Sequence, residues 1–314
     1  MDARAEAFER LGGRYEVRVL EPSPPAVLEP PWFADDPVAL GDVPSGRQVV
    51  SPVGTGDLRW EDLAANDPDL SAWCAERWLG PWRRLAPTPA NLAQTRRALH
   101  ALAENVISPA RRRANGKIGL RYTRGGFGTP FFGGDVQVRV QGAELAVQEA
   151  DVELRAPITT LAAAAEHVGR ELLPEGAALD DQRLDVDPTA CAFLGDWYGF
   201  ATSVLEELRT EGDPTLTDPS RVQLWPEHFD VAVELGRESE GERANYGCSP
   251  GDEDHPEPYL YVGPWRAPAP GELWNATAFP GAEMPYAALL EVGDQQAAAL
   301  EFFRRRQAAL SAGA

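Results

Sequence analysis

The chemistry-bearing residues of this chain are concentrated in residues 221–262. Two strand-like runs, HFDVAVEL and PYLYV, flank a polar loop there. Side chains two residues apart in a β-strand point to the same face. In HFDVAVEL, alternation therefore predicts a polar face that carries His228, Asp230 and Glu234. It predicts a buried face made of the apolar residues Phe229, Val231, Val233 and Leu235.

His228 and Asp230 are the candidate catalytic residues. Two positions apart on a strand, the carboxylate could orient the imidazole, and the pair could act as a general base or supply two metal ligands. No nucleophile, third ligand or fixed spacing accompanies the pair in the sequence. The alternative interpretation is a histidine satisfied by its surroundings, or a surface ion pair.

Four further residues are candidate ligand-binding residues. Tyr259 and Tyr261 take the polar face of PYLYV, and Arg121 and Arg139 take similar positions in LRYT and DVQVRV. If the two parts of the chain bring these faces together, a cleft for a small polar or anionic molecule results, with Tyr259 positioning the ligand and Arg121 meeting an anionic group. The alternative is that these are ordinary solvent-facing residues of one-sided sheets.

The loop SPGDEDHPEP collects acidic side chains next to a cysteine. Asp252, Asp254 and His255 offer ligands to a hard cation, but their spacing lacks the calcium-loop pattern, and a solvated turn is the simpler interpretation. Cys248 could be a nucleophile only if a histidine beside it lowers its pKa, and a small buried thiol is favoured instead. We predict no metal site and assign no cofactor.

Charge and composition limit the partners. The net charge of −20 disfavours nucleic acid and anionic membranes, because phosphate binding needs a positive footprint. No apolar run is long enough to span a membrane, and the first residues lack the apolar core of a signal peptide. Three widely spaced cysteines indicate no disulfide framework, so a cytoplasmic location is expected.

The order of elements predicts an α+β fold. Residues 1–87 contain proline-rich pieces and form an irregular, partly helical N-terminal extension. Residues 88–180 and 181–314 each read as a helix, a set of closely spaced strands and a second helix. The strands are too close together for crossover helices, so the sheets are antiparallel. The prediction is two helix–antiparallel sheet–helix halves packed together.

Four stretches in this order resemble a bacterial family of domains of unknown function: LRYTRGGFGTPFFGGDVQVRV, RVQLWPEHFDVAVELG, YGCSPGDEDHPEPYLY and MPYAALLEV. The resemblance covers roughly residues 88–310. It implies a helix, a strand cluster and a helix in each half, and it implies no reaction, cofactor or catalytic residue. Members of that family often carry histidines near the first strand, where this chain reads NGKIGLRYT.

Two classes of function follow from these observations. The first is a cytoplasmic protein whose polar cleft binds, and as an enzyme would transform, a small polar or anionic molecule. The second is a non-catalytic protein-interaction module that uses its acidic surface and exposed aromatic residues near Trp265 and Trp274. A concave pocket that joins His228 to Tyr259 would favour the first, and a flat aromatic patch the second. The sequence specifies neither a reaction class nor an oligomeric state.

Overall fold

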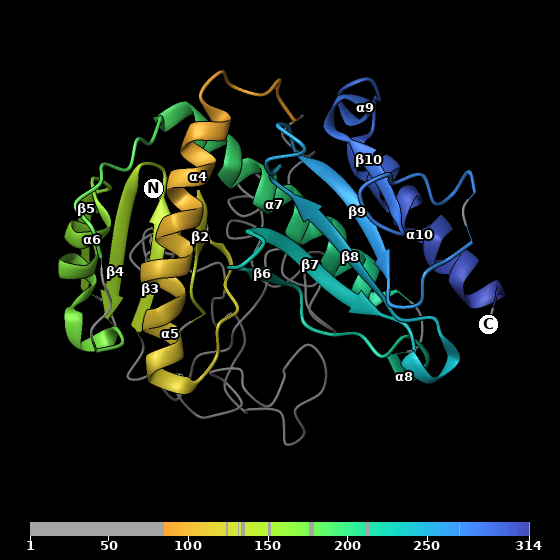
Figure 1. Ribbon diagram of the computed structural model, residues 1–314, viewed down its shortest axis with the longest axis horizontal. Helices are drawn as coiled ribbons and strands as arrows, with labels where there is room; N and C mark the ends of the chain where they lie inside the picture. The colour runs from red at the N-terminus through yellow and green to blue at the C-terminus, as the bar shows by residue number, and fades with distance from the viewer. Residues whose placement is uncertain are drawn as a thin grey trace, which may run out of the picture.

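The computed structural model contains helices and two five-stranded antiparallel sheets, which confirms the α+β class (Figure 1). It describes residues 85–313 except for gaps at 124, 131, 133–135, 150–151, 176–178, 212–213 and 270. The N-terminal extension expected over residues 1–87 lies outside the described residues as far as residue 84.

The first sheet is a meander in which each strand pairs with the next along the chain. Val138, Val140 and Leu145 lie on the apolar face of this sheet, and Gln137, Arg139 and Gln148 on its other face are buried as well. Gly142, with a φ of 60°, allows the tight turn between the third and fourth strands. The strands are β1 (Arg121–Thr123), β2 (Gly126–Gly128), β3 (Val136–Gln141), β4 (Glu144–Glu149) and β5 (Val152–Pro157).

The second sheet repeats this meander and adjoins the first sheet at one edge. The backbone of Leu120 exchanges hydrogen bonds of 2.7 and 2.8 Å with that of Leu224, so β1 and β6 lie side by side. The two sheets therefore meet edge to edge. The strands are β6 (Gln223–Trp225), β7 (Asp230–Leu235), β8 (Ala244–Ser249), β9 (Tyr259–Pro264) and β10 (Ala282–Pro285).

The helices pack against the sheets and one another. A π-helical turn, Ala103–Ile107, joins the first two described helices. The described part of the chain contains no helix with the length and apolar character needed to cross a bilayer. The α-helices are α4 (Leu92–Leu102), α5 (Ser108–Asn115), α6 (Leu161–Val168), α7 (Pro188–Thr210), α8 (Pro214–Thr217), α9 (Tyr286–Leu290) and α10 (Gln295–Ala312), and the 3₁₀ turns are Arg170–Leu172 and Glu238–Glu240.

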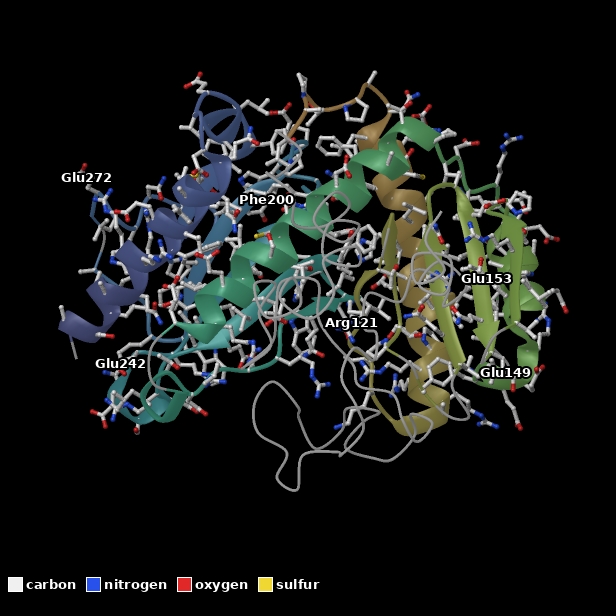
Figure 2. The ribbon with its side chains drawn as sticks, turned by 180° about the vertical axis from the view of Figure 1, so that it is seen from behind. Arg121, Glu149, Glu153, Phe200, Glu242 and Glu272 are labelled. Atoms are coloured by element: carbon white, nitrogen blue, oxygen red, sulfur yellow. The ribbon has the colours of Figure 1, made fainter. Side chains whose placement is uncertain are left out.

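Helix α7 is the centre of the core, because it contacts both sheets and both α4 and α10. It begins where the Asp187 side chain accepts hydrogen bonds from the N–H groups of Thr189 and Ala190, at 2.9 and 3.0 Å. Phe200, seen on α7 in Figure 2, is buried. At Gly195, a Cβ atom would lie 2.7 Å from the backbone of Gly125, so only glycine permits this close approach of helix and sheet.

Candidate functional site

A cleft of about 730 Å³ lies over the polar face of the second sheet, where that sheet meets helix α4. Strands β7, β8 and β9 form its floor, α4 forms one wall, and the loops at 226–229 and 250–258 form the rim. The cleft joins His228 to Tyr259, as the small-molecule hypothesis requires. The residues on which its chemistry depends are Arg97, His228, Asp230, Asn245, Tyr259 and Tyr261.

Asp230, the first residue of β7, lies in the floor of the cleft and is only 3% exposed. Its Oδ2 accepts a hydrogen bond from the hydroxyl of Tyr261. Its Oδ1 is buried and accepts no hydrogen bond from any other described residue. Burial raises the pKa of Asp230, and the Tyr261 hydrogen bond and the nearby His228 oppose that rise. The cleft therefore contains a carboxyl group with one unused oxygen.

Tyr261 reaches Asp230 across an intervening strand because that strand has a glycine at the crossing point. Tyr261 lies on β9 and pairs in register with Gly247 on β8, which pairs with Ala232 on β7. A Cβ atom at position 247 would overlap the Tyr261 ring. The missing side chain thus lets the ring lie over β8. Sequence reasoning placed Tyr261 on the polar face but did not identify this glycine.

Tyr259 is held by the acidic loop that follows β8. Its hydroxyl donates to Oδ2 of Asp252 at 2.7 Å, and its ring lies 4.4 Å from that of His255. Oδ1 of Asp252 accepts from the backbone N–H groups of Asp254 and His255, at 2.9 and 2.7 Å. Burial alone would raise the pKa of Asp252, but these hydrogen bonds, with that of Tyr259 first among them, lower it. Asp252 thus organises a turn.

The other metal-binding candidates in that loop do not converge. His255 places Nδ1 3.3 Å from Asp252 and Nε2 3.3 Å from Oε2 of Glu283, which bridges the loop to β10. Among the described residues, no three histidine, cysteine, aspartate or glutamate side chains are grouped so that they could hold a metal ion. The loop therefore contributes a wall of the cleft.

Arg96 ties this loop to α4. Its side chain is 6% exposed and donates to the carbonyl oxygens of Pro250, Asp252 and Pro256, at 3.4, 2.6 and 3.2 Å. These bonds span more than 150 positions in the sequence. Arg97, the next residue, is exposed and also lines the cleft. The cleft is therefore assembled from two distant parts of the chain.

His228 lines the cleft for a different reason from the one that alternation suggests. Phe229 has a left-handed φ of 57°, so β7 begins only at Asp230 and His228 belongs to the preceding turn. No hydrogen bond joins His228 to Asp230 or to any other described residue, and the side chain is exposed. The expected pair on one strand is thus wrong in its geometry, although both residues reach the same cleft.

His100, to which the sequence assigned no role, holds this turn against α4. Its ring stacks on that of Phe229 with centroids 5.1 Å apart, and its Nε2 lies 2.8 Å from the carbonyl oxygen of Pro226. The hydroxyl of Tyr198 on α7 donates to the carbonyl of Phe229 at 2.9 Å. These contacts hold the left-handed residue that ends the turn.

Arg121 and Arg139 do not lie in the cleft with His228, which corrects the expectation of a shared site. Arg139 is buried in the first sheet, where it pairs with Glu153 and donates to Gln148 at 3.1 Å. Figure 2 shows Arg121 near the middle of the molecule and Glu153 among the strands of the first sheet. Because the sheets meet edge to edge, their polar faces do not close on each other, and α4 supplies the second wall instead.

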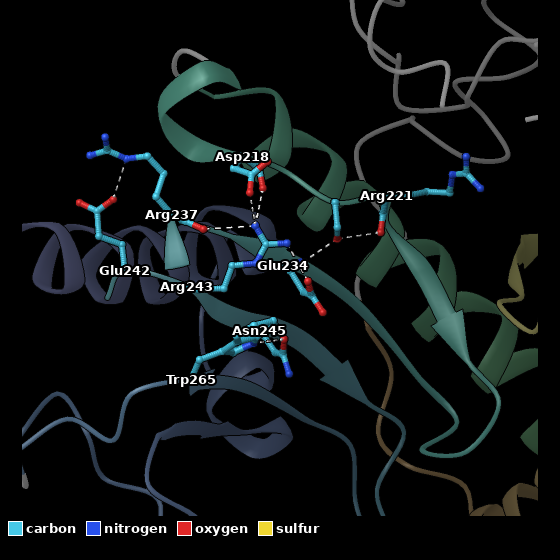
Figure 3. A network of polar contacts seen from close by, with 10 residues as sticks. Asp218, Arg221, Glu234, Arg237, Glu242, Arg243, Asn245 and Trp265 are labelled. Atoms are coloured by element: carbon cyan, nitrogen blue, oxygen red, sulfur yellow. Dashed lines mark hydrogen bonds and ion pairs between the residues drawn. The ribbon is translucent and has the colours of Figure 1, made fainter. Parts of the chain in front are cut away.

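A polar network supports the far side of the cleft (Figure 3). Asn245 accepts a hydrogen bond from the indole Nε1 of Trp265 at 3.3 Å, and the guanidinium of Arg243 lies 5.6 Å from the centre of that Trp265 ring. Arg243 also pairs with Glu234 at 2.7 Å and with Asp218 at 2.8 Å. The Trp265 indole, which packs against Arg243, thereby holds the side chain of Asn245.

Cys248 does not contribute a nucleophile to the site. Its side chain is fully buried on the core face of β8, and burial raises the pKa of its thiol well above the usual value. The ionisable side chains that line the cleft are those of four carboxyl residues, two tyrosines, two histidines and two arginines. A buried carboxyl and an exposed imidazole in one cleft are the side-chain types that general acid–base chemistry uses.

Comparisons with known proteins add no information about this site. The sequence matches no family model and no curated protein, and the fold matches no solved structure. The resemblance to a bacterial family of domains of unknown function stays a prediction.

Proposed function

We propose that this protein binds a small polar molecule in the cleft over β7, β8 and β9, with Asp230 as the anchor. The supporting observation is the buried Oδ1 of Asp230, which has no partner among the described residues. Buried polar atoms in folded proteins are nearly always hydrogen-bonded. A donor group on a ligand would satisfy this oxygen, and a cleft of about 730 Å³ is of a size suited to small molecules.

The same residues supply proton chemistry if the bound molecule is transformed. Because burial raises the pKa of Asp230, this carboxyl group can both accept and return a proton closer to neutral pH than an exposed aspartate. His228 at the rim would exchange that proton with solvent. Tyr259, whose hydroxyl is committed to Asp252, would position the ligand with its ring, and Arg97 would take the role expected of Arg121.

Native mass spectrometry of the protein purified from its own host tests this proposal. We expect the wild type to retain a small molecule, and His228→Ala to retain less of it with little change in melting temperature, because His228 is exposed and outside the core. An empty wild-type protein, or equal retention by both proteins, would contradict the proposal. A large fall in the melting temperature of His228→Ala would assign that residue a structural role.

The interaction-module hypothesis has less support. Trp265 is 51% exposed, but its indole is held by Asn245 and Arg243, and Trp274 is half-buried against the core. The two side chains therefore do not supply the freely exposed aromatic pair that this hypothesis needs. A second protein retained in the same native mass spectra would favour it.

A further inference from the structure

We infer that the group a ligand presents to the floor of this cleft is a protonated amine or another N–H cation. This inference rests on the proposed function and names the class of its ligand. Its first support is Asp230, whose Oδ1 can accept a hydrogen bond that no described residue provides. A buried carboxylate is stabilised most by a partner that carries both a hydrogen-bond donor and a positive charge.

The aromatic lining of the cleft is the second support. The rings of Tyr259 and Tyr261 lie with centroids 6.2 Å apart, and Phe279 meets the Tyr261 ring edge-on at 6.3 Å. The faces of aromatic rings carry negative charge density and attract ammonium and guanidinium groups within about 6 Å. A cation bonded to Asp230 would lie beside the ring of Tyr261, which donates to the other oxygen of that carboxyl.

The balance of charge around the cleft is the third support. Arg96 directs its N–H groups to three carbonyl oxygens of the rim loop, so they are engaged within the protein. Arg97, at the outer wall, is exposed to solvent. The cleft is also lined by four carboxyl groups, those of Glu227, Asp230, Asp252 and Glu253, of which Asp252 has both oxygens engaged within the protein and Asp230 only one. A cation is therefore favoured at the floor, and a negative group on the same ligand would lie outward, toward Arg97.

Isothermal titration of three molecules with one skeleton tests the inference. Tyramine ends in an ammonium group, tyrosol in a hydroxyl group and 4-hydroxyphenylacetate in a carboxylate. We expect tyramine to bind the wild type at least ~10-fold more tightly than tyrosol. A hydrogen bond between charged groups is about twice as strong as a neutral one, and this difference corresponds to about a tenfold difference in affinity. The carboxylate should bind most weakly.

Two variants assign this preference to Asp230. Asp230→Asn keeps the shape and removes the charge, and should reduce the preference for tyramine to less than about 2-fold. Asp254→Asn removes an exposed carboxylate of the rim loop that does not line the cleft, and should leave the preference unchanged. Circular dichroism checks that both variants fold.

A pH series on the wild type keeps the test valid if Asp230→Asn fails to fold. Tyramine should lose affinity as the pH falls through the raised pKa of Asp230, whereas tyrosol should not. Tyrosol controls for pH-dependent changes in the shape of the cleft, whose other titratable groups are those of His228, His100, Glu227, Asp252 and Glu253.

Three results would overturn the inference. In the first, tyrosol or 4-hydroxyphenylacetate binds as tightly as tyramine. In the second, Asp230→Asn keeps the preference for tyramine. In the third, none of the three molecules binds. None of them decides the proposed function, which is judged separately by the molecule that the protein retains from its host.

Discussion

At the scale of single residues, Asp230 is a buried carboxyl group in the floor of the cleft. It is buried, it receives one hydrogen bond from Tyr261, and its second oxygen has no described partner. Asp252, in the same cleft, is the opposite case, because both of its oxygens accept hydrogen bonds. Protein carboxylates are normally stabilised as Asp252 is, and the unused oxygen of Asp230 is the observation that supports the proposed binding role.

The stability of the protein should depend on pH through Asp230. Burial raises its pKa in the folded state above the unfolded value, so the folded protein binds this proton more tightly. This contribution to stability is fully present at pH values below the pKa of Asp230 in the unfolded chain. It is lost as the pH rises through the pKa of Asp230 in the folded protein. Urea unfolding should show the wild type losing stability relative to Asp230→Asn over that range, by at most about 1.4 kcal/mol per pH unit.

Asp252→Asn is the matched comparison for this titration. The pKa of Asp252 is lowered in the folded protein. Its contribution to stability is therefore present at pH values above its pKa in the unfolded chain and is lost as the pH falls through its pKa in the folded protein. The two variants should therefore differ from the wild type with opposite pH slopes. Equal slopes would show that Asp230 is not held in the folded protein with a raised pKa.

Gly247 should control the position of Tyr261. In Gly247→Ala the new methyl group would overlap the Tyr261 ring, so the ring must move away from Asp230. We expect a loss of roughly 1–3 kcal/mol in the free energy of unfolding, measured by urea denaturation. The control is Gly263→Ala on β9, where a Cβ atom meets open space. If Gly247→Ala is as stable as Gly263→Ala, the ring does not lie over β8.

At the scale of elements, the cleft depends on how α4 and the rim loop are joined. The Arg96 side chain donates three hydrogen bonds to backbone carbonyls of residues 250–256, and His100 holds the turn at 226–229. One face of α4 therefore sets the width of the cleft, although this helix precedes the second sheet by more than 120 residues.

Removal of the Arg96 guanidinium should loosen the rim loop. Arg96→Met keeps much of the apolar side chain and deletes three hydrogen bonds, which we expect to lower the free energy of unfolding by roughly 1.5–3 kcal/mol. Amide hydrogen exchange of residues 250–258 should become faster. Arg97→Met, a change of the exposed neighbour, is the control and should leave that exchange as it is. Unchanged protection in Arg96→Met would mean that α4 does not hold the loop.

Local patterns were sufficient to predict many of these elements. The closely spaced strands form antiparallel sheets, and Tyr259 and Tyr261 share the polar face of β9. Each of these features depends on residues within a few positions of one another. Two features of the site had no such signal, namely the left-handed backbone of Phe229 and the glycine beneath the Tyr261 ring.

At the scale of the whole molecule, the sequence predicted two similar halves but not how they meet. The sheets join edge to edge through Leu120 and Leu224, and α7 covers both. This arrangement keeps Arg139 in the first sheet and brings Arg96, Arg97 and His100 to the second. Such long-range contacts depend on the packing of the complete core, which no local pattern in the chain encodes.

The central claim is that Asp230 anchors a small molecule in the cleft between α4 and the second sheet. Native mass spectrometry of three proteins expressed in the original host tests it most directly: the wild type, Asp230→Asn and, as control, Asp254→Asn. We expect one added small-molecule mass on the wild type and on Asp254→Asn, and its loss from a folded Asp230→Asn. The same added mass on all three proteins, or on none, would contradict it.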